Sequence, residues 1–455
     1  MPAGTVSFTA FSASSRGVGA QTIAQQAAAV PRAGTLGISY LGSSVTHLAA
    51  DTAAGFTLAE LDLQWNSAST GDNTFSSSYL TDAAMVVSTL KSAGYQVAVS
   101  AGIFNFPTWL STDVANWCYL DQQSNAGAGY ANFVFNPTIR SKAAAYISAL
   151  QSAMTAAGVT PDYYRVGIGL NGETFLPDTL PIPVGTSSSP AGSFWAFDAL
   201  AQAPGGAGLP AGIGACPLIG WVPGTATYSG GAVTSAMAAN WWNWYMGAVN
   251  NAHQWEIAAH QATGWNGCIM IVTPGQGLRP AVLANRLTTA NPGYLGPSTI
   301  SPGDQQANIA AYWPSMLAAC ANPANTVLDI SSVGDNSGTS TGGGVNNASE
   351  AGDQSAPLTG GSGSADPYYS GWSSVRWLAY LAGKQGVLTL GESVGDGGGH
   401  TNALASQVTG VMQQARECGL YGLMWAHDAN MNGAPGTPPY ATAAQVGAGF
   451  RAAWP

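Results

Sequence analysis

Short apolar runs alternate with longer amphipathic stretches along most of the chain. Each run is continuous, as expected for a parallel strand that is buried on both faces, rather than alternating as in a half-exposed strand. We therefore predict eight buried strands. They cover residues 34–43, 59–66, 96–104, 164–173, 268–275, 326–335, 386–393 and 419–428.

The stretches between these runs have the length and apolar spacing of helices. Helices are predicted at residues 81–94, 138–157, 233–264, 305–321, 371–384 and 402–419. Alternating strands and helices imply a parallel sheet with right-handed crossovers, and eight such units favour a closed (β/α)8 barrel of the TIM type. A doubly wound open α/β sheet is the alternative.

Two regions stand outside the regular alternation. Residues 1–33 are expected to form an N-terminal extension that packs on a barrel of residues 34–455, with a strand and a short helix before Pro31. Long loops are predicted after strand 4 (176–231) and strand 6 (331–370). The second loop has the Gly, Ser and Asn content of a linker, but the alternation resumes after it. Loops that follow strands build the sites of barrel enzymes.

Charge is scarce: 7% of the 455 residues are charged, against about 25% in a typical domain. Twelve scattered Lys and Arg do not form the basic footprint of a nucleic-acid-binding protein, and a hydrophobic content of 46% excludes a disordered chain. No apolar run is long enough to span a membrane, and no secretory signal is visible. The Ser-, Gly- and Thr-rich composition favours an extracellular or virion-associated protein.

No cofactor or metal site is expected. The five cysteines form no CxxC pair, and the five histidines lack metal-ligand spacing with carboxylates. A GxSxG nucleophile elbow is also absent, which argues against a serine hydrolase.

Glutamate is rare enough for each position to matter. Glu173 ends predicted strand 4 and Glu392 ends predicted strand 7, so a barrel would bring both into one bowl. Two carboxyls across a cleft are the machinery that cleaves a glycosidic bond. The structural alternative is that both bond loop amides. The six glutamates are Glu60, Glu173, Glu256, Glu350, Glu392 and Glu417.

Glutamates at the ends of strands 4 and 7 resemble the pattern of the clan A glycoside hydrolases, which are retaining (β/α)8 enzymes. The resemblance implies that Glu173 is the acid/base and Glu392 the nucleophile. That clan places Asn directly before its strand-4 Glu, where it bonds the sugar 2-hydroxyl. Here Gly172 takes that place, and Asn171 lies one residue earlier.

The segment VGIGLNGETFLP (166–177) is similar to the strand-4 motif of β-amylases, glycoside hydrolase family 14. Helix 241–267, the run FPTWL (106–110) and LGES (390–393) also resemble that family. β-Amylases invert, which implies that Glu173 is the acid and Glu392 the base. The clear match covers residues 164–275, and the flexible-loop Asp motif of β-amylases is not evident, so starch is not predicted as the substrate.

Polar and indole side chains after predicted strands and in the loop after strand 4 are candidates for sugar contacts, because amides bond hydroxyls without charge and indoles stack on sugar rings. Strand capping and core packing are the alternatives for each. The candidates are Gln64, Trp65, Asn66, Asn105, Trp109, Asn171, Trp195, Trp221, Gln276, Asp335, Trp425, His427 and Asp428.

The sequence thus predicts a glycoside hydrolase that acts on a neutral poly- or oligosaccharide through a two-glutamate retaining mechanism. An inverting mechanism with the same glutamates is one alternative. The other is a barrel without activity, which binds glycans or forms part of a virion. The oligomeric state stays open.

Overall fold

The computed structural model describes most of the chain from residue 34 onward. The described residues are 34–41, 45–169, 172–174, 176–177, 194–273, 323–331, 333, 374–392, 405–425, 431 and 441–455. The predicted 1–33 extension and 305–321 helix lie outside them, as does nearly all of the 331–370 loop.

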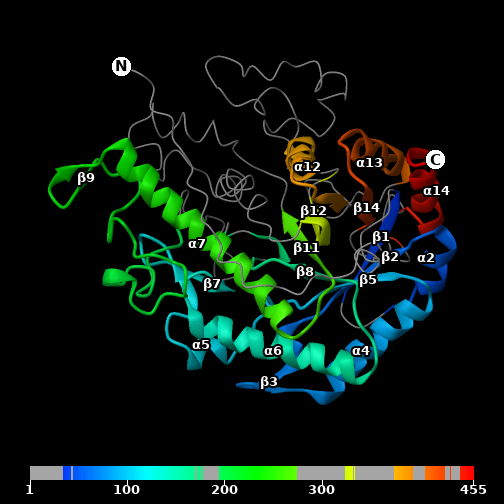
Figure 1. Ribbon diagram of the computed structural model, residues 1–455, viewed down its shortest axis with the longest axis horizontal. Coiled ribbons are helices and arrows are strands. Elements are labelled where there is room, and N and C mark those ends of the chain that lie inside the picture. Colours follow the sequence, from blue (N-terminus) through cyan, green and yellow to red (C-terminus); the bar gives the residue numbers. More distant parts are fainter. Residues whose placement is uncertain are drawn as a thin grey trace, which may run out of the picture.

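Eight parallel strands close into a barrel, which confirms the predicted TIM-type (β/α)8 fold and excludes the open sheet (Figure 1). β1 pairs with β14 on one side and β2 on the other, so the first and last strands complete the ring. The barrel strands are β1 (Thr35–Leu41), β2 (Leu58–Asp62), β5 (Gln96–Ser100), β8 (Tyr163–Val166), β11 (Cys268–Thr273), β12 (Thr326–Ile330), β13 (Leu388–Glu392) and β14 (Gly422–Trp425).

Helices surround the barrel in the order of the strands that they follow (Figure 1). They are α2 (Leu48–Ala54), α4 (Ser77–Ser92), α6 (Pro137–Ala156), α7 (Ser235–Ala262), α12 (Ser374–Lys384), α13 (Ala405–Glu417) and α14 (Ala443–Ala453). The sequence did not predict α2 or α14. α4 begins earlier than predicted because the Ser76 hydroxyl accepts a hydrogen bond from Tyr79 N and caps the helix there.

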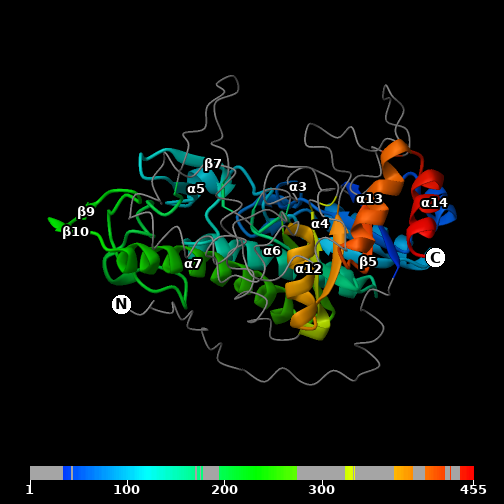
Figure 2. The same ribbon diagram turned by 90° about the horizontal axis from the view of Figure 1, so that it is seen from above.

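Smaller elements extend the loops that follow the strands. α3 (Trp65–Ala68) and the hairpin of β3 (Ser69–Gly71) and β4 (Thr74–Phe75) follow β2, and α5 (Leu110–Asp113) with β6 (Cys118–Leu120) and β7 (Ala126–Ala131) follow β5. Figure 2 shows α3, α5 and β7 on the same side of the molecule. β9 (Thr227–Tyr228) and β10 (Gly231–Ala232) form a hairpin before α7, and η2 (Pro204–Gly206) and η5 (Pro323–Asn325) are single 3-10 turns.

The interior of the barrel has two layers. Side chains alternate between the two faces of a strand, so every second residue points inward. An apolar cluster fills one layer, and it is separate from the larger core between barrel and helices. Its members are Leu58, Ala98, Tyr163, Cys268, Met270, Val327, Leu390 and Met424.

Two residues further along the same strands, the layer nearer the carboxyl ends is polar. Arg165 follows Tyr163 on β8, Asp329 follows Val327 on β12, and Glu392 follows Leu390 on β13. β2 contributes Glu60 in the same way, directly beside Ser39 of β1. These strands were predicted as continuous apolar runs. The structure shows that they also contain charged residues, which point into the barrel interior.

Several strands are shorter than predicted. Strand 4 was expected to run to residue 173, but β8 ends at Val166 and Glu173 lies beyond a turn. Strand 2 was expected to run to residue 66, but β2 ends at Asp62 and Gln64 precedes α3. Strands 6 and 8 end at Ile330 and Trp425. No helix in the described part of the chain is long and apolar enough to cross a membrane.

Candidate active site

A tight turn after β8 carries Glu173. Gly169 N donates to Glu173 O (2.8 Å) and Gly172 N donates to Gly169 O (3.2 Å). Gly172 has φ +72°, which L side chains rarely adopt. A Cβ on Gly167 would lie 1.8 Å from Gly172 O, so the backbone itself occupies that space. The glycines of the 166–177 segment are therefore required by the turn that presents Glu173.

Helix α7 holds this turn from behind. The Glu256 carboxylate accepts a hydrogen bond from Gly167 N, and His253 Nδ1 lies 3.1 Å from the Thr174 hydroxyl. Thr174 N also donates to Val272 O of β11 (3.1 Å). Burial raises the pKa of Glu256 to about 8 and lowers the pKa of His253 to about 4. Glu256 falls within the helix predicted at residues 233–264. Its contact with Gly167 was not predicted, because helical spacing alone does not show which strand a helix faces.

The Glu173 carboxylate is partly exposed and accepts a hydrogen bond from the Ser331 hydroxyl. Ser331 directly follows Ile330, which pairs with Gly391 next to Glu392. The hydroxyl therefore places Glu173 at the carboxyl end of β12, beside the strand that carries Glu392. Ser331 was not among the predicted site residues, although it is a hydroxyl directly after Ile330 within the predicted strand 326–335.

Glu392 ends β13, and its side chain is 13% exposed. Its Oε2 forms an ion pair and hydrogen bond with Nη2 of Arg165, which reaches across the barrel from β8. Arg165 also pairs with Glu60, with 2.7 Å between Nη1 and Oε1. The guanidinium is nearly buried, so both pairs lie in a medium where their electrostatic interaction is stronger than in water.

The remaining carboxyls of this layer hold protons more tightly than free side chains do. Burial raises the pKa of Glu60 to about 8 against the opposing charge of Arg165. Burial likewise raises the pKa of Asp62 to about 6. The pKa of Asp329 lies well above its ordinary value, first because of burial and then because of the Glu392 charge. Removing a carboxyl from water disfavours its charged form.

Three amide candidates lie at the ends of β2 and β5. Asn66 N donates to Asn105 O (2.7 Å), which ties the two strand ends together. Gln64 and Asn66 are exposed and Asn105 is half-buried. The Gln64 side chain accepts a hydrogen bond from the Ser67 hydroxyl (3.1 Å). Gln64 and Asn66 therefore present uncharged groups to solvent beyond the end of β2.

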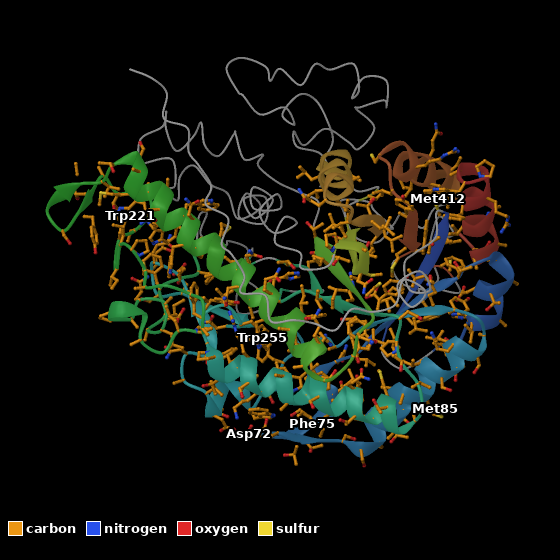
Figure 3. The ribbon with its side chains drawn as sticks, viewed as in Figure 1. Asp72, Phe75, Met85, Trp221, Trp255 and Met412 are labelled. Atoms are coloured by element: carbon orange, nitrogen blue, oxygen red, sulfur yellow. The ribbon has the colours of Figure 1, made fainter. Side chains whose placement is uncertain are left out.

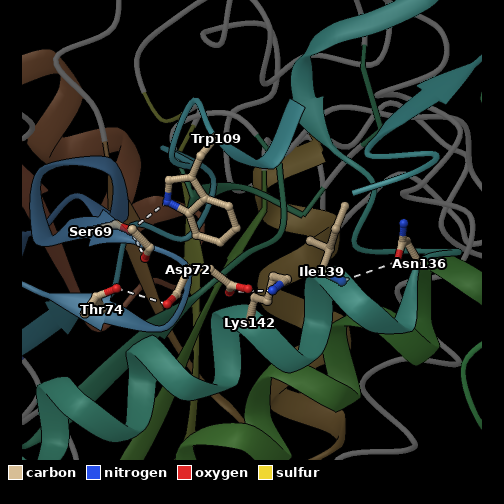
Figure 4. Close-up of polar contacts among 8 residues, drawn as sticks. Ser69, Asp72, Thr74, Trp109, Asn136, Ile139 and Lys142 are labelled. Carbon is tan, nitrogen blue, oxygen red and sulfur yellow. Dashed lines mark hydrogen bonds and ion pairs between the residues drawn. The ribbon is translucent and has the colours of Figure 1, made fainter. Parts of the chain in front are cut away.

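Trp109 is half-buried and has polar neighbours (Figure 4). Its indole N–H donates to the Ser69 hydroxyl (2.9 Å), and Lys142 Nζ lies 5.3 Å from the ring centroid. Asp72 forms an ion pair with Lys142 and holds that ammonium over the indole (Figure 4). The cation covers part of the ring that was predicted to contact sugar.

The other four predicted tryptophans are buried, which agrees with the core-packing alternative given for each of them. Trp65 stacks on Tyr146 with 6.1 Å between ring centroids, and it is 1% exposed. The remaining three are also buried: Trp195, Trp221 and Trp425. Figure 3 shows Trp221 beside the N-terminal part of α7, at the end of the molecule away from α13 and α14. Apolar packing explains their positions, because indoles bury large areas.

Five candidates lie outside the described residues: Asn171, Gln276, Asp335, His427 and Asp428. No group of three His, Cys, Asp or Glu side chains within the described ranges has the arrangement of a metal site. The four cysteines described there, Cys118, Cys216, Cys268 and Cys418, are buried.

Comparison with known proteins shows similarity of structure. The chain aligns with the catalytic domain of a β-amylase from Paenibacillus polymyxa at TM-score 0.57 and 17% identity, covering 92% of this chain and 98% of that one. A β-glycosidase aligns at TM-score 0.43, with 12% identity and 94% and 97% of the two chains covered. A family 5 xyloglucanase from Paenibacillus pabuli aligns at 0.41, with 11% identity and coverage of 94% and 99%.

The β-amylase alignment spans nearly the whole of both chains and shows a common barrel fold. No protein-family description and no curated protein sequence matches this chain. A fold is shared by proteins with unrelated functions, so the activity has to be argued from the site.

Proposed function

We propose that this protein is a glycoside hydrolase in which Glu173 is the proton donor and Glu392 is the nucleophile. The observation that carries the proposal is that two glutamates lie at the carboxyl end of the barrel in different surroundings. Glu173 is partly exposed with a hydroxyl donor, whereas Glu392 is ion-paired with a buried guanidinium. Different environments for two carboxyls are the usual way to separate an acid from a nucleophile.

In the proposed first step, the protonated Glu173 gives its proton to the glycosidic oxygen while the Glu392 carboxylate attacks the anomeric carbon. The bond to the leaving sugar breaks, and a glycosyl ester forms on Glu392. In the second step, the Glu173 carboxylate takes a proton from water. The water oxygen attacks the anomeric carbon, the ester bond breaks, and both glutamates return to their starting states.

The Arg165 contact favours the role of nucleophile for Glu392. A guanidinium stabilises the ionised carboxyl, which suits a group that attacks as an anion and leaves as an anion. A general base has to accept a proton, and the same contact opposes that. The inverting mechanism is the second candidate, because the glycine pattern of 166–177 resembles β-amylases. Carboxyl separations of about 5–5.5 Å and roughly 6.5–9.5 Å distinguish the two mechanisms.

A neutral oligo- or polysaccharide is the proposed substrate. Twelve Lys and Arg in 455 residues offer little to an anionic glycan, and Gln64, Asn66 and Asn105 present uncharged groups at the barrel edge. We further propose that the protein acts outside the cell or on a virion, where polysaccharides are accessible.

The test is the release of reducing sugar from a panel of neutral glycans by wild type, Glu173→Gln and Glu392→Gln. Asp82→Asn, an exposed position on α4, is the matched control. We expect both glutamine variants to lose at least about 1,000-fold in kcat and the control to match wild type.

Wild-type activity in both glutamine variants would overturn the assignment of the two residues. Binding of a glycan by wild type without release of sugar would overturn the hydrolase and support the glycan-binding alternative. The anomeric form of the first product, measured by NMR, separates retention from inversion.

A further inference from the structure

The polar layer of the barrel contains more carboxyls than its cation can balance. Four carboxyls face one guanidinium, and if all were ionised the layer would carry a net charge of −3. Isolated buried charges are strongly destabilising, so such a layer retains protons on some of its acids. The five groups are Glu60, Asp62, Arg165, Asp329 and Glu392.

Asp329 and Glu60 are the two fully buried acids of this layer, both 0% exposed. Asp329 lies on β12, and neither of its oxygens meets an N–H or O–H donor among the described residues. The Glu392 carboxyl acts on Asp329 both through its charge and as a hydrogen-bond partner, and both effects raise the pKa of Asp329. Two carboxylates are both acceptors, so a hydrogen bond between them requires a proton on one of them.

The surroundings of Asp329 and Glu392 determine which of the two carboxyls holds the proton. Glu392 is bonded to Arg165 and is 13% exposed, and both features favour its ionised form. Asp329 has neither advantage, and burial, followed by the Glu392 charge, raises its pKa well above the ordinary value. These surroundings favour a proton on Asp329 rather than on Glu392.

We propose that Asp329 is a positioning residue that remains protonated and holds the Glu392 carboxylate by a hydrogen bond, opposite the ion pair with Arg165. This inference rests on the proposed function for its catalytic consequence. Two donors on different strands fix the direction of the Glu392 carboxylate. A hydrogen bond to a charged group is stronger than one between neutral groups.

Other titratable groups reinforce this arrangement. Glu60 from β2 and Arg165 from β8 also act on Asp329, and its neighbour on β11 is the apolar Val272. Because the pKa of Glu60 is about 8, Glu60 ionises at alkaline pH and adds negative charge to the layer. Added negative charge makes loss of the Asp329 proton harder, so Asp329 is expected to stay protonated after Glu60 has ionised.

Infrared spectroscopy of the purified protein tests the protonation without any substrate. At about pH 9.5, above the pKa of about 8 for Glu60 and Glu256, wild type should retain the carbonyl stretch of a buried protonated carboxyl. Asp329→Asn should lack that band, and Glu392→Gln should shift it. A band that is unchanged in both variants, or absent from wild type, would overturn the proposal. If Asp329→Asn does not fold, the Glu392→Gln comparison still decides it.

Kinetics on a glycan that wild type hydrolyses tests the positioning role. Asparagine keeps an N–H donor, so Asp329→Asn should retain kcat within a few-fold. Asp329→Leu has no donor and should lose about 10- to 100-fold in kcat with little change in KM. Equal losses in the two variants would overturn positioning through the hydrogen bond. Failure of the proposed function would remove all hydrolysis but leave the infrared result intact.

Discussion

The substitution Glu256→Gln tests the protonation of a buried acid that supports the turn carrying Glu173. Glu256 is 2% exposed on α7, accepts the Gly167 N–H, and has an Oε2 with no partner among the described residues. Burial raises its pKa from 4.5 to about 8. Glutamine has the same shape and keeps a carbonyl oxygen for Gly167, but it cannot ionise.

The magnitude follows from linkage between proton binding and folding. The folded chain binds the Glu256 proton more tightly than the unfolded chain, so the stabilisation is complete below pH 4.5 and is lost as pH rises through about 8. Each pH unit in this window changes the free energy of unfolding by about 1.4 kcal/mol. Between pH 5 and pH 8, Glu256→Gln should therefore gain on the order of 4 kcal/mol relative to wild type.

Urea unfolding at pH 5, 6, 7 and 8 measures this difference. Comparison with wild type at each pH cancels the contributions of the other titrating groups. Asp82→Asn on the exposed face of α4 is the control and should show a difference that does not change with pH. A stability difference between Glu256→Gln and wild type that is equally flat from pH 5 to pH 8 would refute the buried, protonated state of Glu256.

Two further substitutions test the packing. Trp65→Ala should lower the free energy of unfolding by about 3–5 kcal/mol, because Trp65 is buried against Tyr146, while glycan affinity of the folded protein stays the same. Loss of affinity without loss of stability would instead support a sugar contact. His260 stacks on Tyr164 with 4.0 Å between centroids, and burial lowers its pKa to about 3. The folded protein binds a proton on His260 less tightly than the unfolded chain does, so wild type loses stability as pH falls from 6.5 toward 3. Phenylalanine cannot be protonated, so His260→Phe should lose less stability than wild type between pH 7 and pH 4, measured by thermal unfolding. An equal difference in melting temperature between His260→Phe and wild type at pH 4 and at pH 7 would contradict this prediction.

The sequence predicted the barrel because a strand covered on both faces needs apolar residues at every position. Each of the eight runs, from 34–43 to 419–428, overlaps a barrel strand. Strand ends were harder to predict. The turn at Gly167 and Gly172 stops β8 well before Glu173, and an apolar run continues through it unchanged. Local composition does not distinguish a buried strand from a buried turn.

The chemistry of the barrel interior was the main omission. Arg165 and Asp329 stand inside runs that are otherwise apolar, and Glu60 was assigned only to the start of a strand. Nothing in their spacing along the chain indicates that they meet. Arg165 and Glu392 are 227 residues apart, and the register of the closed barrel alone brings them into contact.

By itself, the sequence determined the strand order, the barrel and the place of Glu392 at a strand end, because these depend on local patterns of burial and on a rare residue next to an apolar run. Only the tertiary structure decided which tryptophans pack in the core and which acids share the interior with Arg165. The physical reason is that apolar burial is imposed residue by residue along the chain. Ion pairs and retained protons depend on distances across the barrel, which exist only after it closes.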